Sequence, residues 1–175
     1  MSEQETEEPN PMKKINVAKV TVNISEENVG DGVENAVDLI EKLTGRTPIR
    51  TESNEEAKTF GLRSGLNTGA MVTLRGEEAE EFLKKVIPAV EEIKASAFSD
   101  GNFAFGISEY IDVPGVDYDA DIGMKGFEAN VVLERPGARV KRRNHKPSEV
   151  GEEHRVSNEE AIQFAEEKLG FEVSQ

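Results

Sequence analysis

The stretch that decides the fold runs from Thr59 to Ile93 and reads TFGLRSGLNTG, then AMVTLRG, then EEAEEFLKKVIPAVEEI. In its middle part, Ala70, Val72 and Leu74 alternate with more polar residues, which predicts a strand with one buried side. The last part predicts an amphipathic helix, because its apolar residues recur at helical spacing: Ala79, Phe82, Leu83, Val86, Ile87, Val90 and Ile93. Such a strand and helix together predict a helix packed on one face of a sheet, with the other face open.

The rest of the chain continues this pattern of short strands and helices. Alternating residues predict strands at 13–24, 47–51, 103–108 and 127–134, and Pro48 favours a sheet edge for the second. We expect one helix capped by Asp31 and ended by Gly45, and another over 157–169, opened by a capping box and ended by Gly170. These elements predict an α+β fold: an antiparallel sheet with helices packed on one face.

Length and composition narrow the class of protein. At 175 residues, the chain is expected to form one domain over 13–175, preceded by a disordered acidic tail over 1–12. It has no cysteine, which excludes disulfides and Cys-ligated zinc, and no apolar run long enough to cross a membrane. The net charge of −14 by itself argues against a nucleic-acid ligand. The basic residues are unevenly spread, however, and the one dense cluster lies at 135–146.

Other chemistries are less well supported by the sequence. Asp117, Asp119, Asp121 and Glu128 have the spacing of calcium ligands in an EF-hand, but Ile122 stands where that loop needs glycine. A solvated acidic loop is therefore the better interpretation. The two histidines lie in the basic region with no partner for zinc or for a nucleophile. We expect no catalytic residue, no metal and no cofactor.

Two features do suggest a ligand. The predicted open face carries Lys19, Thr21, Asn23, Thr73 and Arg75, which are residue types that contact nucleic-acid phosphates and sugars. The cluster at 135–146 contains six lysines and arginines and could form an RNA-binding arm in this otherwise acidic chain. The alternative for each feature is that it contacts only solvent and binds no ligand.

Several short runs, in the same order and spacing, make the chain resemble a known family over residues 13–170. They are LTGRTP at 43–48, FGLRSG at 60–65, VTLRG at 72–76, FLKKVIP at 82–88, DGNFAFGI at 100–107, VDYD at 116–119 and RPGARVKRR at 135–143. With these runs the chain resembles the large-subunit ribosomal protein L5 family, which binds 5S ribosomal RNA (rRNA), in its archaeal form.

The resemblance implies a fold and a set of contacts. The family has an antiparallel sheet with helices on one face, and the other face docks on 5S rRNA through positions that fall here on Asn23, Phe60 and Thr73. Arg46 stands where the family usually has glutamine, so a charge able to bind phosphate replaces an amide. The loop over 52–68 resembles the one that approaches the transfer RNA in the peptidyl site (P-site tRNA). The family also contacts large-subunit rRNA and forms a bridge to a small-subunit protein.

We therefore predict a non-enzymatic structural protein of the large ribosomal subunit, located in the cytoplasm. The cations expected to bind rRNA are Lys13, Lys14, Lys19, Arg46, Arg50, Arg63, Arg75, Arg135, Arg139, Lys141, Arg142 and Arg143. Polar or stacking contacts are expected from Thr21, Asn23, Thr47, Phe60 and Thr73, and tRNA contacts from Ser53, Asn54, Lys58 and Thr59. The alternative is an acidic protein-interaction module of the same fold with no RNA ligand. The acidity suggests a salt-adapted cytoplasm, in which concentrated cations screen self-repulsion.

Overall fold

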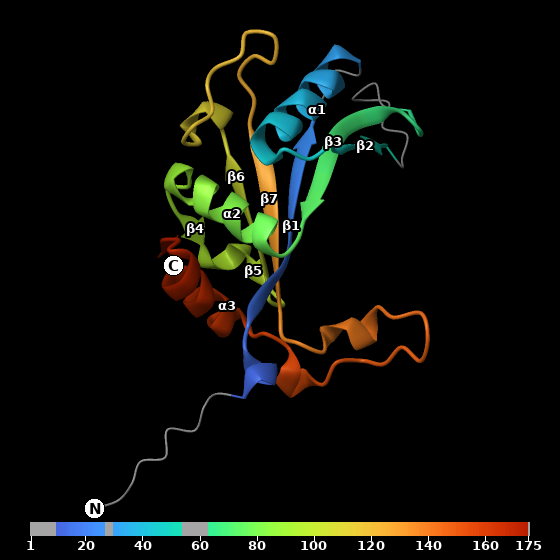
Figure 1. The fold of residues 1–175 in the computed structure, drawn as a ribbon, viewed down its shortest axis with the longest axis vertical. Coiled ribbons are helices and arrows are strands. Elements are labelled where there is room, and N and C mark those ends of the chain that lie inside the picture. The colour runs from blue at the N-terminus through green and yellow to red at the C-terminus, as the bar shows by residue number, and fades with distance from the viewer. Residues whose placement is uncertain (1–9, 27–29, 54–62, 175) are drawn as a thin grey trace, which may run out of the picture.

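The computed structural model describes residues 10–26, 30–53 and 63–174. Its main sheet has six strands, all paired antiparallel, in the order β2-β3-β1-β7-β6-β5. In chain order these strands are β1 (Asn16–Ser25), β2 (Ile49–Glu52), β3 (Asn67–Leu74), β5 (Phe98–Ser99), β6 (Asn102–Ile107) and β7 (Phe127–Glu134). The helices are α1 (Asp31–Thr44), α2 (Glu77–Val86) and α3 (Asn158–Phe164). Helices α1 and α2 lie across the same face of the sheet (Figure 1), which confirms the predicted α+β class.

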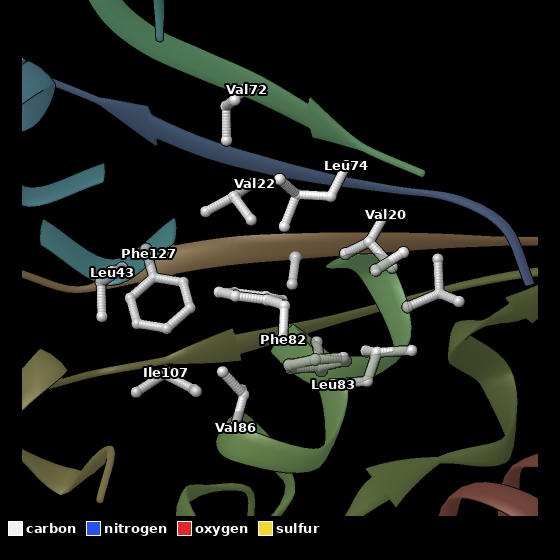
Figure 2. Close-up of a cluster of buried hydrophobic side chains, with 14 of the residues drawn as sticks. Val20, Val22, Leu43, Val72, Leu74, Phe82, Leu83, Val86, Ile107 and Phe127 are labelled. Carbon is white, nitrogen blue, oxygen red and sulfur yellow. The ribbon is translucent and has the colours of Figure 1, made fainter. Parts of the chain in front are cut away.

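The core lies between this sheet and its helices. On the central strand β1, Val20 and Val22 are fully buried, and their neighbours in β3 and β7 are buried as well. Figure 2 shows the side chains of α2, including Phe82 and Leu83, packed against these strand residues. Burying a side chain of this size stabilises the fold by about 1.5–3 kcal/mol. The predicted alternation along the strands is thus confirmed.

The first helix begins one residue away from the expected cap. Gly30 is the N-cap residue, with a backbone φ of 106°, and Asp31 is the first residue inside the helix. The prediction that Asp31 caps this helix is therefore wrong, although its carboxylate still lies near the positive end of the helix dipole. The helix ends as expected, at Gly45 in the left-handed conformation.

The second helix is shorter than its apolar spacing predicts. It ends at Val86 and passes into a 3-10 turn over Ile87–Ala89, because Pro88 has no N–H to donate and cannot continue an α-helix. Ile93, expected on this helix, belongs to the short strand β4 (Ile93–Lys94), which pairs in parallel with β8 (Val173–Ser174).

Both termini of the described chain depart in detail from the expectations. Strand β1 begins at Asn16 rather than 13, because residues Pro11–Lys13 form a 3-10 turn in which the side chain of Asn10 accepts the N–H of Met12. The tail predicted over 1–12 overlaps this turn at Pro11 and Met12, and residues 1–9 lie outside the described residues. At the other end, the capping box of Ser157 and Glu160 is present. Helix α3 then widens into a π-helical turn over Ala165–Leu169 before Gly170 ends it.

Arg135, which directly follows β7, forms hydrogen bonds with several segments at this end of the sheet. Its side chain is only 9% exposed, and its Nη2 donates to Glu160 Oε1 at 2.6 Å. The other nitrogens donate to the backbone carbonyls of Lys13, Glu153 and Arg155 at 3.1–3.2 Å. One guanidinium group thus joins the 3-10 turn before β1, the segment before α3 and α3 itself.

The close approach of β3 to β1 depends on Gly69. A Cβ at this position would lie 2.2 Å from the carbonyl oxygen of Ile24. We expect Gly69→Ala to lower the free energy of unfolding by about 1–3 kcal/mol, because the two strands must move apart. Urea denaturation measures this change. Gly106→Ala, in β6 with no atom within 4 Å of the new Cβ, is the control and should change stability by less than about 0.5 kcal/mol. Equal midpoints for both variants would contradict the steric argument.

The bonds made by Arg135 give a second expected outcome. Arg135→Gln should lower the free energy of unfolding by about 1–3 kcal/mol, the range for lost hydrogen bonds to a charged group. Arg139→Gln makes the same change of charge at an exposed side chain a few residues away and should be nearly neutral. Thermal unfolding of the two variants compares them, and an equal loss in both would mean that only net charge matters.

Candidate nucleic-acid interface

The face of the sheet opposite α1 and α2, called the open face below, carries a row of uncharged polar side chains. Thr21 of β1 lies directly opposite Thr73 of β3 on one side and Asn130 of β7 on the other. Thr73 and Asn130 are exposed, and Thr21 is half-buried by its neighbours. Hydroxyl and amide groups in such a row can each donate and accept hydrogen bonds, as ribose hydroxyls require.

Charged and apolar side chains flank this row. Lys19 and Asn23 are half-buried on the same side of β1 as Thr21, and Arg75 is exposed just after β3. The structure thus brings together the five residues that were expected on this face. In the next row, Met71 lies between Asn23 and Ile49, and Ile49 is 61% exposed.

Some residues of the open face were not singled out from the sequence. Asn130 and Glu128 of β7, and Asn102 of β6, are exposed there beside the expected residues. The signal that could have found Glu128 and Asn130 is the alternation in 127–134, in which both are polar positions between apolar ones. Asn102 lies one residue before the strand expected from 103 and follows from no such signal.

Two shallow hollows lie on this face. The first, called the β3 hollow, has a volume of ≈ 780 Å³ and is lined by Arg46, Thr47, Ile49, Met71, Val72, Thr73, Arg75, Glu77 and Glu78. The second, called the β7 hollow, has a volume of ≈ 570 Å³, and its lining includes Lys19, Asn102, Asn130, Glu134 and Arg142. Each hollow combines cations with neutral hydrogen-bonding groups. That combination suits an RNA backbone, in which phosphates alternate with sugars.

Arg46 lies at the rim of the β3 hollow, immediately after the glycine that ends α1. Its Nε donates to Glu78 Oε2 at 3.1 Å, and its Nη2 donates to the other oxygen of the same carboxylate. These hydrogen bonds, together with the negative charge of Glu78, raise the pKa of Arg46 above its ordinary value. The side chain remains a permanent cation at the edge of the open face.

Arg50 does not belong to the open face. In β2 it pairs with Ala70, a buried residue on the helix side, whereas its neighbours Ile49 and Thr51 point the other way. Its Nη2 donates to both carboxylate oxygens of Glu34 in α1, at 2.7 and 3.0 Å. Arg50 is therefore separated from the expected residues of the open face, because side chains alternate between the two faces of a strand.

The basic cluster over 135–146, called the basic arm below, folds into a loop that projects from the lower end of β7 (Figure 1). A 3-10 turn over Ala138–Lys141 shapes it, and the backbone N–H of Ser148 donates to Val140 O. His154 Nε2 lies 2.8 Å from Pro136 O and connects the start of the basic arm to the 3-10 turn over Glu152–His154.

The cations of the basic arm differ in how accessible they are. Arg139, Lys141, Arg142 and Arg143 are all exposed, and Arg142 in addition donates to Glu134 at 2.6 Å. The side chain of Arg135 is 9% exposed and its donors are directed at protein acceptors, which favours the structural role described above; its contact with rRNA stays a prediction. Its positive charge also helps to lower the pKa of Glu160, although the backbone N–H of Ser157 is the largest cause.

The remaining expected site residues lie at the margins of the described chain. Lys13, Lys14 and Arg63 are exposed, and Thr47 lines the β3 hollow. Phe60 and the expected tRNA contacts Asn54, Lys58 and Thr59 lie outside the described residues. Ser53 is at the base of that loop, where its backbone N–H donates to Leu66 O and its carbonyl accepts from Gly65.

The acidic loop after β6 is attached to α1. Asp119 accepts from Lys42 Nζ at 3.2 Å, which is the main cause of its lowered pKa, and its backbone N–H donates to the hydroxyl of Tyr110. In the parts of the chain that the structure describes, no three acidic or histidine side chains come together as a metal site. The described helices also include none that is long and apolar enough to cross a membrane.

Comparison with known proteins agrees with this architecture. Two family models match consecutive parts of the chain: "Ribosomal protein L5" covers residues 10–63, and the model of the C-terminus of the same ribosomal family covers residues 67–164. A protein of Nanoarchaeum equitans named large ribosomal subunit protein uL5 is 47% identical over 93% of this chain and 98% of its own length. Proteins of the same name from Sulfurisphaera tokodaii and Methanococcus vannielii are 43% and 44% identical, over 97% and 99% of this chain and 97% and 98% of their own lengths. The chain belongs to the ribosomal protein L5 family.

Proposed function

We propose that this protein is a non-catalytic structural component of the large ribosomal subunit and binds 5S rRNA through the open face of its sheet. The observation that carries the proposal is the row of Thr73, Thr21 and Asn130, which no element among the described residues covers. The names of its relatives support the assignment to the large subunit, and with it a place in the cytoplasm.

The two hollows suggest how the RNA is bound. Arg46 and Arg75 at the β3 hollow, and Lys19 at the β7 hollow, would contact phosphates and fix the position of the RNA. The threonine and asparagine side chains between them would bond to ribose hydroxyls. Ile49 and Met71 offer an apolar surface for a sugar or a base.

The distribution of charge makes an RNA ligand compatible with a net charge of −14. Many carboxylates are exposed on the helices, which cover the opposite face of the sheet: Glu34, Asp38 and Glu41 in α1, Glu80 and Glu81 in α2, and Glu159 in α3. The strands add Glu128 and Glu134 to the open face. Because salt screens interactions over about 8 Å, the distant carboxylates repel a phosphate only weakly.

We also propose three contacts that the family resemblance implies, with rRNA, with the P-site tRNA and with a small-subunit protein. The basic arm exposes Arg139, Lys141 and Arg143 and is suited to rRNA. The loop over 52–68, whose base is closed by bonds between Ser53 and the residues near Gly65, would approach the P-site tRNA. A neighbouring small-subunit protein would complete a bridge between the subunits.

Electrophoretic mobility of folded 5S rRNA with added protein, at several KCl concentrations, tests the proposal. The protein should shift the RNA, with an affinity that falls as KCl rises. An acidic protein-interaction module without an RNA ligand would leave the mobility of the RNA unchanged at every salt concentration.

A pair of charge reversals tests which face binds. Arg75→Glu should weaken 5S rRNA binding by roughly tenfold or more, which corresponds to one charge-assisted hydrogen bond. Arg50→Glu makes the same change of charge on the helix side and should weaken binding by only about two- to threefold, through long-range repulsion. Equal losses in the two variants would place the RNA elsewhere on the molecule.

A further inference from the structure

The ion pair between Arg46 and Glu78 differs in geometry from the other arginine pairs near the proposed interface. Glu78 accepts from Nε and Nη2 together, so its carboxylate lies along one edge of the guanidinium group. Arg50 and Arg142 each use a single nitrogen, Nη2, for their carboxylates. Two parallel hydrogen bonds fix the plane of a guanidinium group, whereas one nitrogen leaves it free to turn.

The backbone on both sides of this pair is also fixed. Gly45 ends α1 in the left-handed conformation, and the N–H of Arg46 donates to Thr44 Oγ1 at 3.3 Å. Glu78 lies in the first turn of α2, where the helix dipole favours its negative charge. The pair therefore connects the end of one helix to the beginning of the next at the rim of the β3 hollow.

One edge of the guanidinium group remains available. Arginine has five N–H donors, and Glu78 uses one on Nε and one on Nη2. The described residues offer no acceptor to Nη1, and the side chain of Arg46 is 60% exposed. The edge formed by Nη1 and Nη2 has the fork geometry that binds two oxygens of a phosphate.

We propose that Glu78 is a positioning residue for RNA, which holds Arg46 so that its free edge binds one phosphodiester at the β3 hollow. This inference rests on the proposed function, since the phosphodiester belongs to the 5S rRNA. Without the carboxylate, Arg46 would keep its charge but lose its fixed orientation, and ordering a long side chain on binding has an entropic cost.

The opposite effect on RNA binding is expected if Glu78 merely competes with phosphate for Arg46. If Glu78 only occupied Arg46 or repelled phosphate, removal of its charge would tighten RNA binding. Glu81, which is exposed on the same helix and has no ion pair among the described residues, provides the matched loss of one negative charge. The sign of the change therefore separates positioning from competition.

The experiment measures 5S rRNA binding by wild-type, Glu78→Gln and Glu81→Gln proteins over a series of KCl concentrations. We expect Glu78→Gln to weaken binding about two- to fivefold, within the range for one exposed ion pair, and Glu81→Gln to leave it equal or slightly tighter. The dependence on salt should be unchanged in Glu78→Gln, because Arg46 stays charged. In Arg46→Gln, the magnitude of the slope of the logarithm of the binding constant against the logarithm of the KCl concentration should fall by about one. Both partners of the pair are exposed, so circular dichroism should show each variant folded.

A double-mutant cycle completes the test. In the Arg46→Gln background, Glu78→Gln should cause no further weakening, because no guanidinium group is left to position. Tighter binding by Glu78→Gln, or the same weakening in both backgrounds, would overturn the inference while 5S rRNA binding by the wild type stands. Failure of the wild-type protein to bind 5S rRNA would overturn the proposed function itself.

Discussion

The pairing of β1 with strands on both of its sides is the constraint on which the rest of the structure depends. β1 forms antiparallel ladders with β3 and with β7, so its register is fixed twice. The same register decides that Val20 and Val22 face the helices and that Thr21 and Asn23 face away from them. A slip of one residue would exchange the two sets, which would place polar groups in the core and valines on the open face. Stability and the composition of the proposed interface are therefore determined together.

The acidic character of the chain is compatible with this arrangement because the two faces of the sheet differ in charge. The helices shield the apolar side of the sheet and present many of the carboxylates to solvent, where these keep the protein soluble. The open face carries mainly neutral hydrogen-bonding groups, with a few cations at its hollows. Where carboxylates do approach these cations, as Glu78 and Glu134 do, they form ion pairs with arginines.

The extent to which the sequence predicts this structure depends on how local each signal is. The five longer strands, the open face with Lys19, Thr21 and Thr73, and the capping box before α3 follow from alternation and from residues a few positions apart. The two-residue strands β4, β5 and β8 are too short to show any alternation. The early end of α2 could also have been predicted, since Pro88 lies within the stretch that was assigned to the helix. Arg50, which we expected to bind rRNA because of its charge, lies on the helix side of the sheet, as its position in the alternation of β2 indicates.

The contacts of Arg135 could not be predicted from such local patterns. Its partners lie between 18 and 122 residues away along the chain. Three of them are backbone carbonyls, which no pattern of side chains in the sequence can predict. Read as sequence, it is the first cation of a basic cluster; in the structure it is nearly buried and holds three segments together. The same limit applies to the pair of Arg46 and Glu78, which are 32 residues apart and meet only because α1 and α2 end and begin at one edge of the sheet.

The position of β1 in the middle of the sheet has a consequence for synthesis of the chain. Among the strands that the structure describes, β1 is translated first, but its partner β7 lies more than 100 residues later, at Phe127–Glu134. Until β7 has been made, one edge of β1 has no partner, and such unpaired edges invite pairing with other chains. A nascent polypeptide therefore cannot present the complete polar surface of the open face before β7 has been synthesised.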